Sequence, residues 1–143
     1  MVANHDNMLL TFDTCNMEYF DGKLLFPQFD LLHSFRTCGY FYCDYEQEWF
    51  SKKLYNFCIS MTDYYDFTQK QFEDILVHEM IHYYLAYFGE DTNCTHGKKF
   101  KKMAEDLNRK YGLHVTPYLD LSQYKRRPGT PSLSYWFVQK FYM

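Results

Sequence analysis

Residues 76–90 read LVHEMIHYYLAYFGE and carry His78, Glu79 and His82 in the spacing H-E-x-x-H. On a helix, positions four apart differ by about 40° in azimuth and about 6 Å in rise, so the two imidazoles project side by side. Both can therefore reach one tetrahedral ion at about 2.0–2.1 Å. Glu79 lies about 60° around the helix from His82, which suits it to a metal-bound water rather than to the metal. This spacing predicts a helical zinc site with Glu79 as general base.

The helix that carries these residues has signals at both ends. Thr68 and Gln71 in the stretch TQKQ form a capping box, in which each side chain bonds the backbone amide of the other residue. We therefore expect the helix to begin near Thr68 and to end at Gly89. An earlier apolar stripe at three- and four-residue spacing predicts an N-terminal helix over about residues 6–20.

Between these two helices the period of the sequence changes. Residues 29–33, 36–43 and 54–60 are short and rich in strand-favouring residues, so we expect three strands, with a hairpin joining the second and third. The polar stretch DYEQEWFSKK, residues 44–53, is expected to separate these two strands. The order of elements predicts an α+β fold with a small three- to four-stranded antiparallel or mixed sheet, in one domain spanning residues 1–143.

A catalytic zinc site needs a third protein ligand if water is to keep the fourth position. A third helix is expected to run from about Thr95 or His96 to Tyr111, and His96 begins its apolar stripe, which must pack on the core. We therefore predict His96 as the third ligand of one Zn²⁺ ion. Cys94 and Glu105 are alternative ligands, and a helix N-cap is the alternative role of His96. The alternative to the whole site is a structural helix with two buried histidines.

The cysteines and the hydropathy of the chain bear on its location. The five cysteines are odd in number, scattered and without a C-x-x-C pair, which indicates reduced thiols rather than a disulfide framework. The first residues lack a signal-peptide pattern, and no apolar stretch approaches the roughly 18 residues of a transmembrane helix. We therefore expect a cytoplasmic protein without a membrane partner.

Charge is divided unevenly along the chain. Residues 1–96 contain 5 Lys/Arg and 15 Asp/Glu, a net charge of −10, whereas residues 97–143 contain 10 Lys/Arg and 3 Asp/Glu, a net charge of +7. This asymmetry is typical of a nucleic-acid surface, or of a solvated helix face followed by a basic tail. Tyr124 is expected to be available for stacking on unpaired bases. The candidate phosphate contacts are Lys98, Lys99, Lys101, Lys102, Lys125, Arg126 and Arg127.

Three stretches together resemble the SprT-like (Spartan-type) zinc metallopeptidase domain: NMEYFDGKLLFPQF (16–29), ILVHEMIHYYL (75–85) and THGKKF (95–100). Their order and separations are also similar to those of the family, over about residues 6–112. The remaining residues, 113–143, are expected to form an extended, basic C-terminal segment around the turn RPGTP.

The resemblance implies a minimal zincin-like peptidase in which His78, His82 and His96 hold zinc and Glu79 is the catalytic base. It also implies a link to nucleic acid, because the eukaryotic members that resemble this chain cleave proteins crosslinked to DNA and are activated by DNA. Many members follow the peptidase domain with a zinc ribbon of paired cysteines. No cysteine follows Cys94 in this sequence, so we expect no second zinc site here, either because the domain is a minimal one or because the sequence stops before a ribbon.

Two functions follow from these patterns. The leading hypothesis is a zinc metallopeptidase that hydrolyses proteins or peptides, with single-stranded DNA as a partner that presents the protein to be cut. The strand LYNFCIS, residues 54–60, lies just before the helix with the H-E-x-x-H motif, and by analogy with other zincins a strand of this sheet could pair with an extended substrate. His114 or a tyrosine could polarise the scissile carbonyl, but nothing in the spacing selects one, and His5 and His33 are interpreted as structural or solvated. The alternative function is a zinc-stabilised nucleic-acid- or protein-binding module with little or no turnover.

Overall fold

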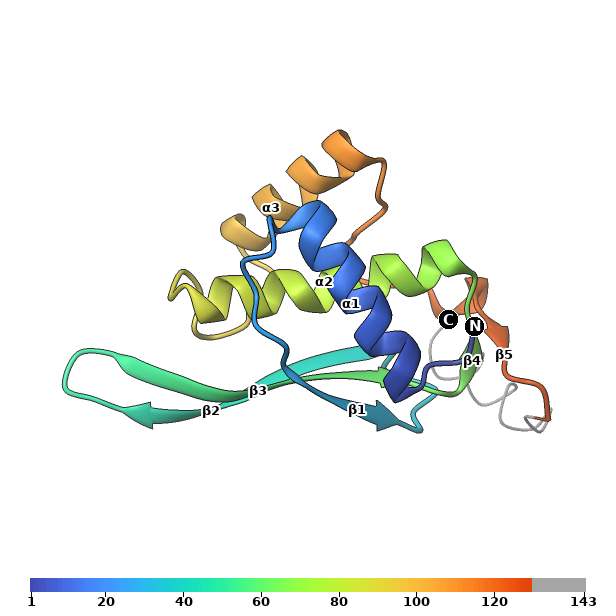
Figure 1. The fold of residues 1–143 in the computed structure, drawn as a ribbon, viewed down its shortest axis with the longest axis horizontal. Coiled ribbons are helices and arrows are strands. Elements are labelled where there is room, and N and C mark those ends of the chain that lie inside the picture. Colours follow the sequence, from blue (N-terminus) through green and yellow to red (C-terminus); the bar gives the residue numbers. More distant parts are fainter. Residues whose placement is uncertain (130–143) are drawn as a thin grey trace.

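The computed structural model describes residues 1–129, in which helices cover one face of a small mixed sheet (Figure 1). This arrangement confirms the predicted α+β fold. In chain order the elements are α1 (His5–Tyr19), β1 (Gln28–Leu32), β2 (Gly39–Gln47), β3 (Lys52–Thr62), β4 (Tyr65–Asp66), α2 (Gln69–Tyr87), α3 (Lys98–Tyr111), the 3-10 turn η1 (Leu121–Gln123) and β5 (Lys125–Arg126).

The main sheet has the strand order β1-β3-β2, with β3 in the centre. β3 pairs in parallel with β1 and in antiparallel with β2, so the sheet is mixed, and the predicted hairpin joins β2 to β3. The register shifts between Tyr42 and Asp44, where two residues of β3, Asn56 and Phe57, stand opposite the single residue Cys43 of β2, so the bulge lies in β3. β4 and β5 form a separate two-stranded ladder.

The polar stretch of residues 44–53 does not separate the strands as expected. Its two ends extend β2 and β3 instead, with Asp44 opposite Tyr55 and Gln47 opposite Lys52. The turn itself is short, because the amide of Glu48 donates to the carbonyl of Ser51 at 2.8 Å. Polar side chains are compatible with strand here because this part of the hairpin is largely exposed on both faces and extends past the helices (Figure 1).

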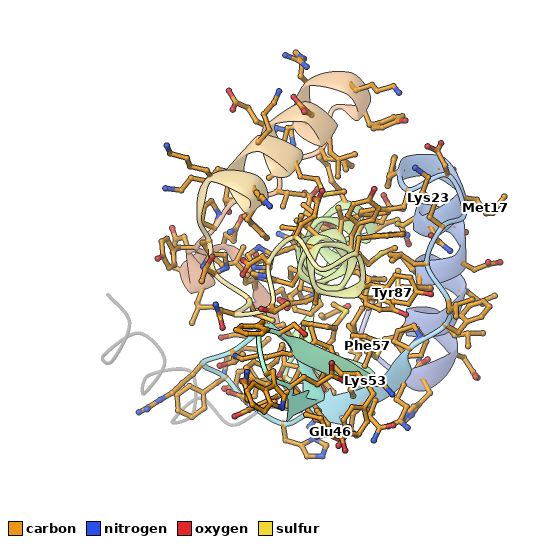
Figure 2. The ribbon with its side chains drawn as sticks, turned by 90° about the vertical axis from the view of Figure 1, so that its left-hand side faces the viewer. Met17, Lys23, Glu46, Lys53, Phe57 and Tyr87 are labelled. Atoms are coloured by element: carbon orange, nitrogen blue, oxygen red, sulfur yellow. The ribbon has the colours of Figure 1, made fainter. Side chains whose placement is uncertain are left out.

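α2 lies at the centre of the fold. Viewed nearly along its axis, it has the sheet below it and α1 and α3 beside it (Figure 2). The predicted capping box is present, because the amide of Gln71 donates to Thr68 Oγ1 at 3.1 Å and the amide of Thr68 donates to Gln71 Oε1 at 2.9 Å. Aromatic rings fill the layer between helix and sheet, and Phe57 of β3 meets Tyr87 of α2 edge-on at 5.8 Å between centroids.

Burial of its side chains holds α2 in place within the fold. Eleven of its residues are buried, among them Met80 and Ile81, which are fully covered. Each such side chain contributes about 1.5–3 kcal/mol relative to an exposed one. The side chains that point from α2 into the space beside β2 are therefore held by a helix with little freedom to shift. None of the helices in residues 1–129 is long and apolar enough to cross a membrane.

The segment after α3 is only partly extended. Residues 113–120 form an irregular connection, followed by η1 and the short strand β5. Tyr124 is buried, with its ring 5.7 Å from Tyr65 and 5.2 Å from Phe67, so the expectation that it stacks on bases is wrong. The segment SLSYWFVQKFYM, for which extended structure was also expected, lies outside the described residues.

Candidate metal centre

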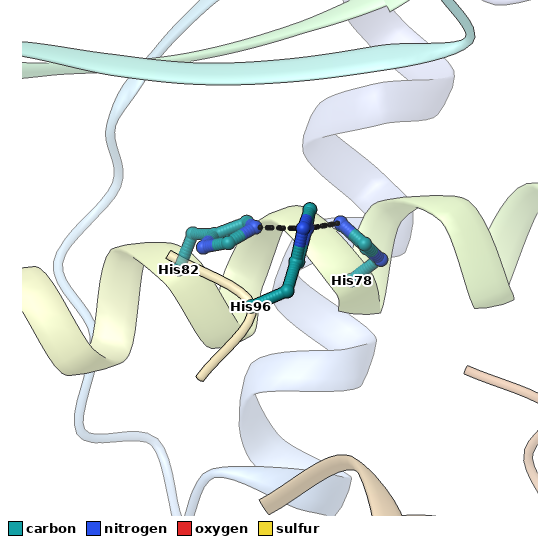
Figure 3. A group of neighbouring side chains, drawn as sticks. All are labelled: His78, His82 and His96. Atoms are coloured by element: carbon teal, nitrogen blue, oxygen red, sulfur yellow. Dashed lines mark hydrogen bonds between the residues drawn. The ribbon is translucent and has the colours of Figure 1, made fainter. Parts of the chain in front are cut away.

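Three histidines converge at one point between α2 and the loop before α3. The Nε2 atom of His96 lies 3.1 Å from Nε2 of His78 and 3.1 Å from Nε2 of His82 (Figure 3). Ligand atoms at about 2.0–2.1 Å from a tetrahedral zinc ion stand about 3.3 Å apart, so this spacing is that of a ligand set. Among the described His, Cys, Asp and Glu side chains, these three form a group that could hold a metal ion.

The orientation of His78 is fixed by the backbone. Its Nδ1 lies 2.8 Å from the carbonyl oxygen of Thr116. A carbonyl can only accept, so Nδ1 carries the proton and the lone pair of Nε2 points toward the other two histidines. Thr116 was not identified from the sequence, because any residue type can supply a backbone carbonyl.

His96 reaches the centre from an ordered loop rather than from the helix expected. α3 begins at Lys98 with Gly97 as its N-cap, so His96 lies two residues before the helix and is not its cap. Asp91 orders this loop, because its carboxylate accepts from the amide and the hydroxyl of Thr95 at 2.9 and 2.8 Å. Of the alternative ligands, Cys94 lines the same cavity outside the three-histidine group, and Glu105 is exposed on α3.

The three imidazoles are neutral at physiological pH. Burial lowers the pKa of His78 to about 4 and that of His82 to about 3, and it also lowers the pKa of the more exposed His96. Because only a neutral imidazole can coordinate a metal, these shifts favour ligation over protonation. The donor set therefore suits a metal ion that prefers imidazole nitrogen, as zinc does.

Glu79 places a carboxylate with an unsatisfied oxygen beside the three histidines. Its side chain is buried, Oε1 lies 3.7 Å from His78 Nε2, and Oε2 has no hydrogen-bond partner in the described part of the protein. Burial raises the pKa of Glu79 to about 8. A cation held by the three histidines would stabilise the charged carboxylate, and a water between them would satisfy Oε2. The residues present therefore fit a metal ion with a bound water.

A cavity of about 580 Å³ opens above the histidines and Glu79. The start of β2 forms one wall, and the segment from Pro117 to Leu121 forms another. The strand LYNFCIS, residues 54–60, is part of the central strand β3 and contributes no residue to this cavity. The edge strand β2 lines the cavity instead, because the hairpin sets β2 on the outside of β3.

Gly39 allows β2 to pass close to Glu79. A Cβ atom at this position would lie 3.1 Å from Glu79 Cγ and 3.2 Å from Ile75 Cγ2, tighter than ordinary contact. In the sequence Gly39 reads only as a break between strand-like stretches. Its close approach to α2 depends on a long-range contact that no local pattern reveals.

The candidate phosphate-binding residues lie away from the cavity. Lys98, Lys99, Lys101 and Lys102 are exposed on α3, as expected from their positions. Some of them bond to nearby groups, as Lys102 does to Asp106 at 3.0 Å. In the tail Lys125 is exposed, Arg126 is half-buried, and Arg127 lies 3.4 Å from Asp63. None of the seven contributes to the cavity wall.

Comparison with known proteins adds one match. The model of the SprT-like family matches residues 10–119, which include the greater part of α1, the main sheet, α2, α3 and most of the loop that follows α3. The matched range also contains the three converging histidines and Glu79. No curated protein matches the sequence.

Proposed function

Because the chain belongs to the SprT-like family, we propose that it is a zinc-dependent metallopeptidase that hydrolyses peptide bonds in proteins. The observation that carries this proposal is the convergence of three imidazole nitrogens beside a buried carboxylate whose Oε2 is unpaired. Three protein ligands with a fourth position left for water or substrate are typical of catalytic rather than structural zinc. A structural site would close the fourth position with another side chain.

Each residue of the centre has a task in this reaction. When bound, zinc supplies Lewis acidity that polarises a carbonyl and lowers the pKa of a coordinated water toward about 7. Glu79 accepts a proton from the attacking water as the water oxygen bonds to the carbonyl carbon. When the peptide C–N bond breaks, Glu79 returns that proton to the leaving amine. The bond from His78 to Thr116 keeps one imidazole in the tautomer that coordination needs.

The edge strand β2 supports an extended peptide as substrate. Residues 37–41 line the cavity at the beginning of β2, and its outer edge is not paired with another strand among residues 1–129. An extended peptide can add to such an edge through main-chain hydrogen bonds, which are independent of sequence. This mode of binding favours unstructured segments of proteins, because a folded domain does not offer a free extended strand.

We propose single-stranded DNA as a partner that brings protein substrates to the enzyme. The exposed lysines of α3 support this partner, because they place positive charge on one helix outside the cavity. Affinity for a single-stranded oligonucleotide should fall steeply between low and moderate salt, and replacing Lys98 and Lys101 with Gln should reduce that salt dependence. Absence of binding at low salt would rule out this partner, and DNA binding without any proteolysis would favour a binding module instead.

Metal removal tests the peptidase proposal. Purified protein should contain about one zinc per chain and should degrade an unfolded protein such as casein. A chelator should abolish the degradation, and stoichiometric zinc should restore it. Degradation that continues after complete removal of the metal would contradict the proposal, and so would a zinc-loaded protein that cuts nothing.

A further inference from the structure

Tyr118 stands at the mouth of the cavity beside the candidate metal centre. Its ring centroid lies 5.4 Å from that of His96, with the rings edge to face at 68°. The residue lines the cavity and is 81% exposed, which is unusual for a tyrosine. Its hydroxyl has no hydrogen-bond partner in the described structure. The ring of Tyr118 thus lies beside His96, a candidate ligand, and its hydroxyl is available to donate a hydrogen bond.

The backbone beneath Tyr118 is fixed at several points. Asn108 of α3 bonds both backbone groups of Val115, accepting from the amide at 2.8 Å and donating to the carbonyl at 2.9 Å. The hydroxyl of Thr116 donates to the carbonyl of Tyr118 at 2.8 Å, and the carbonyl of Thr116 accepts from His78. Three residues later in the chain, Leu121 is buried. The backbone of Tyr118 is therefore held on both sides, and Thr116 connects it by hydrogen bonds to His78, a candidate metal ligand.

His114 and two other tyrosines are less well placed to act on a carbonyl oxygen. His114 is exposed and contributes nothing to the cavity wall. Tyr83 already donates its hydroxyl to the carbonyl of Leu25. Tyr40 lies on the cavity wall, but its ring stacks on Tyr42 at 6.4 Å and contacts none of the three histidines.

We propose that the hydroxyl of Tyr118 donates a hydrogen bond to the carbonyl oxygen of the scissile peptide bond as negative charge develops on that oxygen. This role rests on the proposed peptidase function. A donor aimed at the developing oxyanion stabilises the transition state more than the ground state, so its removal lowers kcat rather than raising KM. Tyr118 keeps its proton throughout, because the leaving amine receives its proton from Glu79.

The test replaces only the hydroxyl. Tyr118→Phe keeps the ring against His96, so zinc content and thermal stability should equal those of the wild type. We expect kcat on an unstructured peptide to fall on the order of 10²-fold, with KM nearly unchanged. Tyr111→Phe is the matched control, because Tyr111 is a partly exposed tyrosine of α3 outside the cavity, and it should keep wild-type kcat.

A binding measurement separates transition-state stabilisation from a packing role. A phosphinic peptide, which resembles the tetrahedral state, should bind Tyr118→Phe more weakly by a factor similar to the loss in kcat. The corresponding peptide with an intact amide bond should bind equally well to Glu79→Gln and to the double variant Glu79→Gln, Tyr118→Phe. Wild-type kcat in Tyr118→Phe, or a loss confined to KM, would overturn the role of Tyr118 alone. A wild-type protein without peptidase activity would overturn the proposed function as well.

Discussion

Nδ1 of His78 donates a hydrogen bond to the carbonyl oxygen of Thr116 at 2.8 Å, across 38 positions of sequence. This bond joins the helix of the candidate metal centre to the loop that follows α3. It orients one candidate ligand and positions the segment that carries Tyr118. Conditions or substitutions that loosen this loop should therefore weaken metal binding and lower catalysis together.

The first prediction concerns Asn108, which holds the loop by two bonds to Val115. Asn108→Ala removes both bonds and leaves backbone groups without partners, which costs about 1–3 kcal/mol of stability for each group that stays buried. Because the loop also orients His78, zinc affinity should fall by about 10-fold or more. A zinc titration against a competing chelator measures this effect. Asp106→Ala on the same helix removes only exposed ion pairs and should leave affinity unchanged. Equal affinities for the two variants would contradict the role of the loop.

Gly39 provides a second prediction. Gly39→Ala places a methyl group 3.1 Å from Glu79 Cγ, so either the strand or the carboxylate must shift. We expect kcat to fall several-fold while zinc content stays stoichiometric, because the histidines are not touched. Gly39→Val adds more atoms at the same point and should lower kcat further. Wild-type kcat in both variants would show that the close approach of β2 is not needed.

His96 is the third test. Its replacement leaves two imidazoles on α2, which hold zinc less tightly than three. His96→Ala should purify with much less than one zinc per chain and keep a near-wild-type melting temperature when both proteins are stripped of metal, since His96 is only half-buried. His114→Ala, an exposed histidine after α3, should retain full zinc. Stoichiometric, tightly held zinc in His96→Ala would exclude it as a ligand.

Stability without metal should depend on pH through His78 and His82. Burial lowers the pKa of His78 to about 4 and that of His82 to about 3, below the ordinary 6.5. Between pH 6.5 and these values the folded protein binds fewer protons than the unfolded chain, so stability falls as pH falls. Burial raises the pKa of Glu79 from its ordinary 4.5 to about 8, which has the opposite sign, because stability is lost as pH rises between these two values. Stability at the two pH values is therefore compared in the Glu79→Gln variant, in which this side chain does not titrate.

The measurement is urea unfolding of chelator-treated Glu79→Gln at about pH 7 and about pH 4.5. We expect a clear loss of unfolding free energy at the lower pH. Adding His78→Gln and His82→Gln should reduce that loss, because glutamine does not titrate. The same loss in both proteins would show that other groups dominate the acid sensitivity.

The parts of this protein that could be predicted from the sequence are those with local signals. The capping box of Thr68 and Gln71 and the spacing of His78 and His82 are complete within one helix, so they identify α2 and the pair of histidines. The start of α3 was expected two or three residues too early. Its apolar stripe includes His96, but the bonds from Thr95 to Asp91 hold that stretch as a loop.

The rest depends on contacts between distant segments. β1 pairs in parallel with β3 although β2 lies between them in the sequence, and no local pattern in either strand signals this pairing. Gly39, Thr116 and Tyr118 are unremarkable residues in sequence, and each gains its significance from a neighbour far along the chain. The surface aromatic expected at Tyr124 is buried because β5 pairs with β4 and carries Tyr124 into the core.

The most direct test of the central claim is cleavage of casein by Glu79→Gln at equal zinc content. Glutamine keeps the size of the side chain but cannot accept the proton of the attacking water. We predict that the variant binds one zinc per chain and cleaves at least about 10²-fold more slowly than the wild type. Cleavage at the wild-type rate by zinc-loaded Glu79→Gln would contradict the claim that this centre is a glutamate-assisted peptidase.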